Sequence, residues 1–363
     1  MKITSTLKQF DWFLFAAVVF LVVVGVATIL STTWGNAESM KILDKQIIAA
    51  LMGIALVFLL SLFNYQILAN YAYIIFGVSI VLLIGVLIFG SVIRGTQGWF
   101  NLGFFQFQPA EFAKVALLIV LAKYFSSIAG KPSRIQHIIV SGLLALIPIG
   151  LIILQPDLGS ALILASLWIL MLLTSGIKRE YVIGLVLIGS ATVFLAWNLV
   201  LAPYQKGRIL SFLNPMSDPL GAGYHMIQSK IAIGSGQLFG RGLGHGTQSQ
   251  LNFLPDQHTD FIFAVVAEEL GFIGALLLLF LLSFLLYRII RIAKKSRNEF
   301  GLMLALGSCF LFLAQMLINM GMNVGIMPVA GVPLPFVSYG GSALLVSLII
   351  IGLLQSVITR QSV

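Results

Sequence analysis

The feature that most limits how this chain can fold is a series of continuous apolar runs, each about 20 residues long. Only 9% of the 363 residues are charged, whereas soluble domains carry about 25%. So few charges cannot cover a surface in water, and we expect the chain to lie in lipid. Backbone polar groups inside a bilayer must be satisfied within the protein, and long non-alternating runs satisfy them as helices. We predict an all-α polytopic membrane protein with a single domain over residues 1–363.

About ten of the runs are long enough to be transmembrane helices. The predicted spans cover residues 11–31, 46–63, 67–90, 110–128, 136–154, 158–175, 181–201, 260–287, 301–324 and 341–358. An even number of spans places both termini on one side. With cytoplasmic termini, 12 of the 21 Lys and Arg residues fall in cytoplasmic segments, as the positive-inside rule favours. We therefore predict a multi-pass protein of the cytoplasmic membrane with both termini in the cytoplasm.

The net charge of +9 is spread over short loops, which favours contact with anionic membrane lipids and gives no indication of nucleic acid. The single cysteine, Cys309, excludes an intramolecular disulfide.

One long segment, about residues 202–259 between the seventh and eighth spans, is expected to be an extracytoplasmic loop. A structureless loop of this length is improbable unless it is functional. Within it, Ala222–Ile233 is apolar on one side and could form a helix on the membrane. Residues 234–246 are rich in glycine, which predicts tight turns and close approach of the backbone to another segment.

Ionisable residues at membrane depth are costly, so each is a candidate functional residue. Glu111 and Lys114 are three residues apart at the start of the fourth span, so they share a helix face and can pair. The pair could be purely structural. Asp157 follows a very short outside turn and could be the N-cap of the sixth span, with or without facing a cavity.

Asp260 lies where the long loop re-enters the membrane. It could cap the eighth span, act as a base if its neighbours raise its pKa, or bind a metal as the anion. His258 could be an accessory ligand or a hydrogen-bonding loop residue. Glu268 and Glu269 follow about two turns later and must point into the bundle, where one could pair with Lys114, Lys123 or a loop arginine.

The segment 323–342 contains three prolines and several glycines and is expected to be a stiff outside loop. Ser338 to Ser342 precede the last span. They could offer hydroxyl and backbone N–H groups to an anion at a helix start, or form only a turn with caps.

Together these groups place carboxylates and cations toward the outer face, which fits a lipid-linked phosphate substrate. The cations are Arg94, Lys114, Arg208, Lys230 and Arg241. The sequence has no nucleotide-phosphate loop, zinc motif or serine nucleophile elbow, and we expect no nucleotide, haem or zinc site.

Several motifs spread over nearly the whole chain carry a resemblance to a known family. They are Gly95–Trp99, Phe107–Lys114, Gln155–Ser160, Asp218–Lys230, Ala232–Gly236, His245–Gln250, His258–Phe263, Glu268–Gly271 and Pro333–Ser342. In these motifs the chain resembles the SEDS family (shape, elongation, division, sporulation), and its elongation branch more than its division branch. Ala110 and Gln237 depart mildly, standing where serine and glycine are common in the family.

The resemblance implies a peptidoglycan glycosyltransferase that polymerises lipid II at the outer face of the cytoplasmic membrane for cell elongation and rod shape. It places the proposed catalytic carboxylate at Asp260 and buried polar residues at Glu111, Lys114 and Asp157. It also implies a partner, a class B penicillin-binding protein of the PBP2 type.

The hypothesis that follows gives Asp260 the activation of an acceptor sugar hydroxyl, directly as base or through a divalent cation such as Mg²⁺ or Mn²⁺. Basic groups would neutralise the departing pyrophosphate, with Arg94, Lys114, Arg208 and Lys230 as unranked candidates. Two other functions are open, a lipid II flippase and a scaffold for a penicillin-binding protein. The short basic cytoplasmic loops argue against the first, and the buried carboxylates argue against the second.

Overall fold

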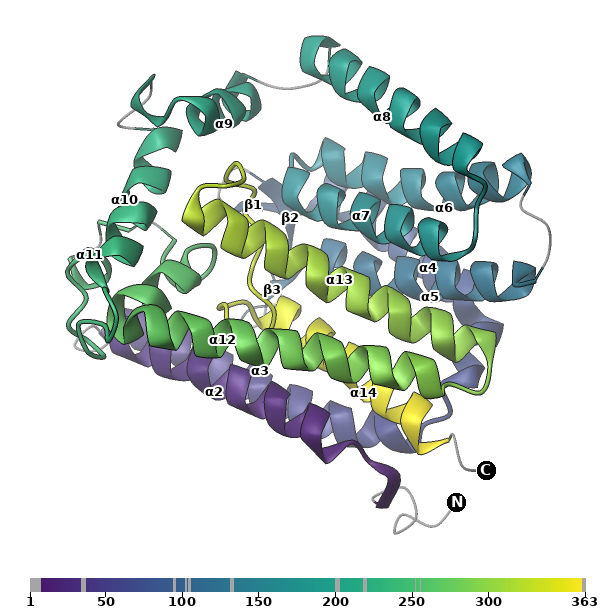
Figure 1. Cartoon of the computed structure of the whole chain (residues 1–363), viewed down its shortest axis with the longest axis horizontal. Helices are drawn as coiled ribbons and strands as arrows, with labels where there is room; N and C mark the ends of the chain where they lie inside the picture. Colours follow the sequence, from purple (N-terminus) through teal and green to yellow (C-terminus); the bar gives the residue numbers. More distant parts are fainter. Residues whose placement is uncertain are drawn as a thin grey trace.

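The computed structural model describes residues 8–33, 37–93, 96–101, 103, 106–130, 134–199, 203–217, 221–251, 253–254 and 256–360. Its long helices form a bundle, and the described ends of the chain lie together at one end of it (Figure 1). These helices are α2 (Trp12–Thr33), α3 (Ala37–Leu62), α4 (Gln66–Phe89), α5 (Pro109–Ile128), α6 (Ile135–Leu154), α7 (Leu158–Thr174), α8 (Arg179–Leu199), α12 (Ile262–Lys295), α13 (Glu299–Val324) and α14 (Gly341–Thr359).

Each predicted span coincides with one of these helices. Seven described helices are long and apolar enough to cross a membrane, namely α2, α3, α4, α6, α12, α13 and α14. The other three differ: α7 has only 17 residues, α5 carries three charged side chains, and α8 is not among the seven. The chain is therefore a multi-pass membrane protein by its helices, and the number of about ten spans stays a prediction.

The all-α prediction is wrong in one detail, because a small antiparallel sheet lies between α4 and α5. Its strands are β1 (Ser91–Ile93), β2 (Thr96–Asn101) and β3 (Gln106–Phe107), in the order β1-β2-β3. Ser91 pairs with Trp99, and Phe100 pairs with Phe107. Here α4 ends at Gly90, which is extended, and the following β-branched and aromatic residues favour strands.

The segment 202–259 is not the non-helical loop that we expected. It contains α9 (Pro203–Leu213), a 3-10 turn at Pro215–Ser217, α10 (Ala222–Ser235) and α11 (Thr247–Gln250). The predicted helix at Ala222–Ile233 is confirmed as α10, which lies against α12 and α13. Helix α9 was missed, although Pro203 at its first position is a favourable start because proline lacks the N–H that is unbonded there.

Helix α13 is the central element, since it contacts α5, α7, α12 and α14 (Figure 1). Gly307 allows its close approach to α5 and α7. A Cβ at this position would lie 2.4 Å from Leu118 Cδ1 and 2.8 Å from Met171 Sδ. Small residues at helix contacts serve this purpose in membranes, where lipid is as apolar as the side chains and packing drives association.

The end of the bundle that holds the chain termini is tied by a buried ion pair. Arg288 in α12 places Nη2 2.6 Å from both carboxylate oxygens of Asp11, which precedes α2. The side chain of Gln355 in α14 exchanges two hydrogen bonds with the backbone of Asp11, at 2.9 and 3.0 Å. The contact joins three helices, because Asp11 precedes α2 and its partners lie in α12 and α14.

Candidate functional site

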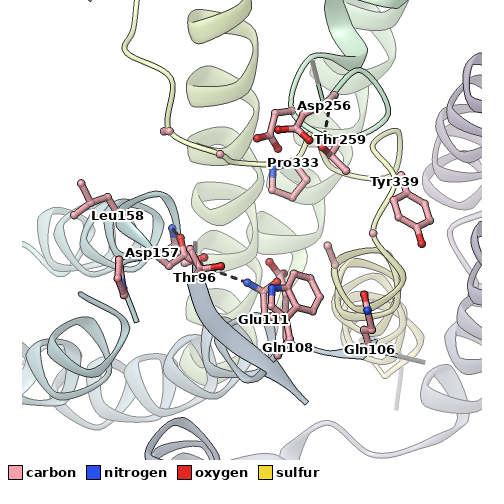
Figure 2. Close-up of a pocket in the computed structure, with 18 of the residues that line it drawn as sticks. Thr96, Gln106, Gln108, Glu111, Asp157, Leu158, Asp256, Thr259, Pro333 and Tyr339 are labelled. Atoms are coloured by element: carbon pink, nitrogen blue, oxygen red, sulfur yellow. Dashed lines mark hydrogen bonds between the residues drawn. The ribbon is translucent and has the colours of Figure 1, made fainter. Parts of the chain in front are cut away.

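A cavity of 460 Å³ with many polar lining residues lies where several segments that are far apart in the sequence meet (Figure 2). The residues around it come from the sheet, the starts of α5 and α7, helix α9, the turn before α12 and the segment before α14. They are Thr96, Trp99, Gln106, Gln108, Glu111, Pro156, Asp157, Leu158, Ser160, Arg208, Asp256, Thr259, Asp260, Ala330, Gly331, Pro333, Tyr339, Gly340 and Ala343.

Four helices begin at this cavity. Gln108, Asp157 and Gly340 are the N-cap residues of α5, α7 and α14, and Asp260 directly precedes Phe261, the N-cap of α12. A helix N-terminus carries unbonded N–H groups and a partial positive charge. The convergence therefore favours anions, both as the protein's own carboxylates and as phosphate groups of a ligand.

Asp260 lines the cavity. Its backbone N–H donates to the carbonyl of Asp256 at 3.1 Å. Asp260 directly precedes Phe261, the N-cap residue of α12. A Cβ added at Gly331 would lie 3.7 Å from Asp260 Oδ2, so the glycine leaves room beside the carboxylate.

The sequence analysis missed Asp256, a second carboxylate in the same turn. It lines the cavity, and its carbonyl accepts hydrogen bonds from the N–H groups of Thr259 and Asp260, at 3.0 and 3.1 Å. Figure 2 shows Asp256 and Thr259 on one side of the cavity and Gln108 and Glu111 on another. Asp256 has a φ of 49°, which aspartate tolerates better than most residues, and its position in a Pro-Asp turn was the available signal.

Asp157 does both things that the sequence analysis left open. Its Oδ1 accepts a hydrogen bond from the Ser160 N–H at 2.9 Å, which caps α7. Its Oδ2 accepts from Gln108 Nε2 at 3.5 Å, the dashed line beside Gln108 in Figure 2. The residue therefore fixes the α7 start to the α5 start while it lines the cavity.

The predicted pair of Glu111 and Lys114 is confirmed. Lys114 Nζ lies 2.5 Å from Glu111 Oε1, and the two residues are only 1% and 3% exposed. Glu111 lines the cavity, whereas Lys114 is not one of the lining residues. Lys114 thus neutralises the carboxylate of Glu111, which lines the cavity, without lining the cavity itself.

The other predicted cations are placed differently. Arg208 lines the cavity from α9. Lys230 in α10 is exposed, and its Nζ lies 2.5 Å from where a Cβ of Gly325 would stand, at the C-terminal end of α13. A cation there complements the helix dipole and is not part of the cavity lining. Arg94 lies outside the described residues.

His258 and Ser338 hold the cavity together and do not line it. His258 Nδ1 lies 3.0 Å from Thr32 Oγ1, and its carbonyl accepts from the N–H of Tyr339 at 2.8 Å. Ser338 Oγ donates to the carbonyl of Thr259 at 2.6 Å and accepts from the N–H of Leu334 at 2.8 Å. Both residues thus join the segment before α14 to neighbouring parts of the structure.

Within the described part of the chain, Glu268 and Glu269 form no ion pair with Lys114, Lys123 or a loop arginine, which was one alternative. Glu268 accepts from the N–H groups of Gln248 and Ser249, at 2.7 and 3.1 Å. Glu269 accepts from the Gly244 N–H at 3.1 Å and from the Ser31 hydroxyl at 2.6 Å. The donors to these buried carboxylates are therefore backbone N–H groups of the glycine-rich segment and of α11, together with one hydroxyl from α2.

The glycine-rich segment also replaces part of the backbone hydrogen bonding of α12, which is interrupted at Gly271 (φ 69°, ψ −166°). The carbonyls of Glu268 and Glu269 each accept from a loop N–H, of Arg241 and Gly242 respectively, at 3.0 Å. A Cβ at Gly240, where φ is 81°, would lie 2.1 Å from the Glu269 carbonyl oxygen. The predicted tight turns and close backbone approach are confirmed.

His225 in α10 faces the same region. Its ring stacks on Phe261 with centroids 6.0 Å apart. Burial lowers the pKa of the His225 imidazole below its usual value, while the Asp256 carboxylate opposes and the Arg208 guanidinium adds to this shift. The ring is therefore held toward its neutral form.

The described residues do not contain three His, Cys, Asp or Glu side chains grouped so that they could hold a metal ion. Asp256 and Asp260 are two carboxylates in one turn, which is fewer protein ligands than a self-sufficient site needs. We therefore derive no step of the reaction through a metal.

Comparison with known proteins identifies the family. The family model of the FtsW, RodA and SpoVE group, described as cell cycle protein, matches residues 6–363. The peptidoglycan glycosyltransferase MrdB of Escherichia coli is 39% identical over 90% of this chain and 88% of its own length. The peptidoglycan glycosyltransferase RodA of Treponema pallidum is 32% identical over 98% of each chain.

Two solved structures agree with this assignment. A chain from a peptidoglycan synthase complex that coordinates polymerization and crosslinking superposes with a TM-score of 0.84 at 33% identity, covering 97% of this chain and 98% of its own. The rod shape determining protein RodA of Thermus thermophilus gives 0.73 at 31% identity, covering 98% of both chains. The chain therefore belongs to the FtsW, RodA and SpoVE family of cell-cycle proteins, and it is a peptidoglycan glycosyltransferase.

Proposed function

We propose that the chain polymerises lipid II into glycan strands at the outer face of the cytoplasmic membrane, for cell elongation and rod shape, with Asp260 as the general base. The observation that carries this proposal is the position of Asp260 in a cavity where four helices begin. The enzyme class of the relatives favours this function over a lipid II flippase or a scaffold.

In the proposed reaction, the Asp260 carboxylate takes the proton of the acceptor sugar 4-hydroxyl. That oxygen attacks the anomeric carbon of N-acetylmuramic acid on the second chain. The bond from this carbon to undecaprenyl pyrophosphate breaks, and the pyrophosphate leaves with the bonding electrons. General-base catalysis of this kind contributes about 10²–10⁴-fold.

The leaving pyrophosphate gains negative charge, and the cavity offers two kinds of stabilisation for it. The N-termini of α5, α7, α12 and α14 direct partial positive charge toward the cavity. Arg208 on α9 adds a full cation. Lys114, which does not line the cavity, neutralises Glu111. The Glu111 carboxylate therefore does not repel the phosphates as an unpaired negative charge would.

Two further parts of the proposal concern what the enzyme needs to work. A class B penicillin-binding protein is the proposed partner, since a similar solved chain belongs to a synthase complex. Mg²⁺ or Mn²⁺ is the proposed alternative to direct base catalysis: Asp256 and Asp260 would hold the ion, which would supply positive charge beside the reacting groups. Activity with and without EDTA, and with each metal added back, tests the second part.

The central experiment compares lipid II polymerisation by the wild type, Asp260→Asn and Asp44→Asn in the presence of the partner. Asp44 is an exposed carboxylate in α3 and is the matched control for loss of one negative charge. We expect Asp260→Asn to lose on the order of 10² or more of the activity and Asp44→Asn to retain it. Full activity of folded Asp260→Asn would refute the role of Asp260 as base.

A further inference from the structure

Two buried asparagines of α13 hold the backbone of Asp260. The carbonyl oxygen of Asp260 accepts from Asn319 Nδ2 and from Asn323 Nδ2, each at 2.9 Å. Both asparagines are 0% exposed. They are four residues apart in α13, so they lie on one face of the helix.

Each asparagine side chain also forms a hydrogen bond to a second segment of the chain. These bonds fix the position of Asp260 relative to the segments around it. Asn319 Nδ2 donates to the Val332 carbonyl at 2.7 Å, in the segment that contributes Gly331 and Pro333 to the cavity. Asn319 therefore links the backbone of Asp260 to the segment that contains Val332. Neither an aspartate nor a leucine could do this, because two N–H groups are needed.

Asn323 supplies the start of α12 with a cap from another helix. The N-cap residue Phe261 makes no side-chain capping bond. Asn323 Oδ1 accepts the N–H of Ala264 at 3.2 Å, and this N–H also donates to the Phe261 carbonyl at 3.0 Å. The same asparagine therefore fixes the residue before α12 and the first turn of α12.

The network extends to α10 through one hydroxyl. Ser229 Oγ donates to the Asn323 carbonyl at 2.8 Å, and Ser229 is 0% exposed. Helix α10 belongs to the segment between α8 and α12, so part of that segment is joined to the support of Asp260.

We propose that Asn319 and Asn323 are positioning residues, which fix the backbone of Asp260 so that its carboxylate points into the cavity, and that Ser229 secures Asn323 from α10. This inference rests on the proposed role of Asp260. With the N–H bonded to Asp256 and the carbonyl bonded to both amides, the peptide groups of Asp260 are held from both sides.

The test separates position from stability. Asn323→Ala and Asn319→Ala are compared with Gln355→Ala, which removes two equally buried amide hydrogen bonds at the end of the bundle that holds the termini. Melting temperature, kcat and KM for lipid II are measured for each variant with the partner bound. We expect kcat to fall at least about ten-fold in the asparagine variants with KM changed less than about three-fold, because a base displaced from its position slows the chemical step.

Gln355→Ala is expected to lower the melting temperature without this selective loss of kcat. Ser229→Ala, which removes one hydrogen bond to the network, is the milder variant if the alanine variants of the asparagines fail to fold. We expect Ser229→Ala to keep its melting temperature within a few degrees of the wild type. Its kcat should fall about two- to five-fold, because a net hydrogen-bond contribution of about 1 kcal/mol corresponds to a change of this size in rate.

The inference is overturned if a folded asparagine variant, or Ser229→Ala, keeps wild-type kcat, or if kcat falls only in step with the melting temperature as it does in Gln355→Ala. Asp260→Asn, measured in the same experiment, separates this failure from that of the proposed function. An inactive Asp260→Asn together with fully active asparagine variants refutes the positioning role alone. An active Asp260→Asn refutes the role of Asp260 itself.

Discussion

Two buried ion pairs stand at different places in the bundle, and the protein uses them differently. The Asp11 carboxylate is saturated, since it accepts three contacts from Arg288 and one from the Leu14 N–H. The Glu111 carboxylate, within the described part of the chain, has Lys114 as its hydrogen-bond partner and lines the cavity. Burial of an ion pair is therefore no sign of function in itself. The pair with an unsaturated carboxylate at a cavity is the one to test for activity.

Breaking the saturated pair should give the largest effect on stability. Arg288→Met leaves the Asp11 carboxylate, whose side chain is 1% exposed, without its cation. The free energy of unfolding is expected to fall by about 3–5 kcal/mol, because a buried charge without a partner is strongly unfavourable. Thermal unfolding in lipid nanodiscs measures this. The double variant Asp11→Asn/Arg288→Met removes both charges and should recover most of the loss; equal losses in the single and double variants would contradict the explanation.

Neutralising each pair completely should separate activity from stability. Glu111→Gln/Lys114→Met and Asp11→Asn/Arg288→Met should both fold with stability within about 2 kcal/mol of the wild type, since buried pairs are often replaceable by neutral side chains. Only the first is expected to lose polymerisation, by about ten-fold or more, which corresponds to about 1.4 kcal/mol in the barrier. If both variants lost activity equally, the functional contrast between the pairs would be wrong.

Acidification should lower the stability of the protein through His225, by less than the two effects above. Because burial lowers the pKa of His225, the unfolded chain binds more protons than the folded chain between pH 6.5 and that lowered pKa. Stability is therefore expected to fall as the pH drops below about 6.5. Melting temperature against pH measures this, and His225→Gln should flatten the dependence. An equally steep dependence in His225→Gln would contradict this explanation.

The sequence predicted the helices better than it predicted the site. Continuous apolar runs are sufficient to locate helices in lipid, and all ten predicted runs are helices. Asp157 and Asp260 could be predicted because acidic residues at membrane depth are rare. Asp256 and Gln108 were missed as site residues. Asp256 lies in a turn and Gln108 directly precedes α5, and only the folded structure brings them to one cavity.

Partners of buried groups were the least predictable part. Charge suggested a lysine or arginine for Glu268 and Glu269, but the backbone N–H groups of Gly244, Gln248 and Ser249 bind them instead. Every residue type except proline has a backbone N–H, so the sequence does not identify such a donor. The support of Asp260 by Asn319 and Asn323 was hidden for a related reason, because neutral amides within an apolar helix attract no attention in a search for charge.

The interruption of α12 at Gly271 has a consequence for protein engineering. Residues 237–242 and 268–273 exchange backbone hydrogen bonds in both directions, so neither segment forms its own structure without the other. A chimera that takes the outer segment from one family member and α12 from another would join two surfaces that were selected separately. Exchanging 234–250 together with 262–274 keeps both sides of these hydrogen bonds from one parent.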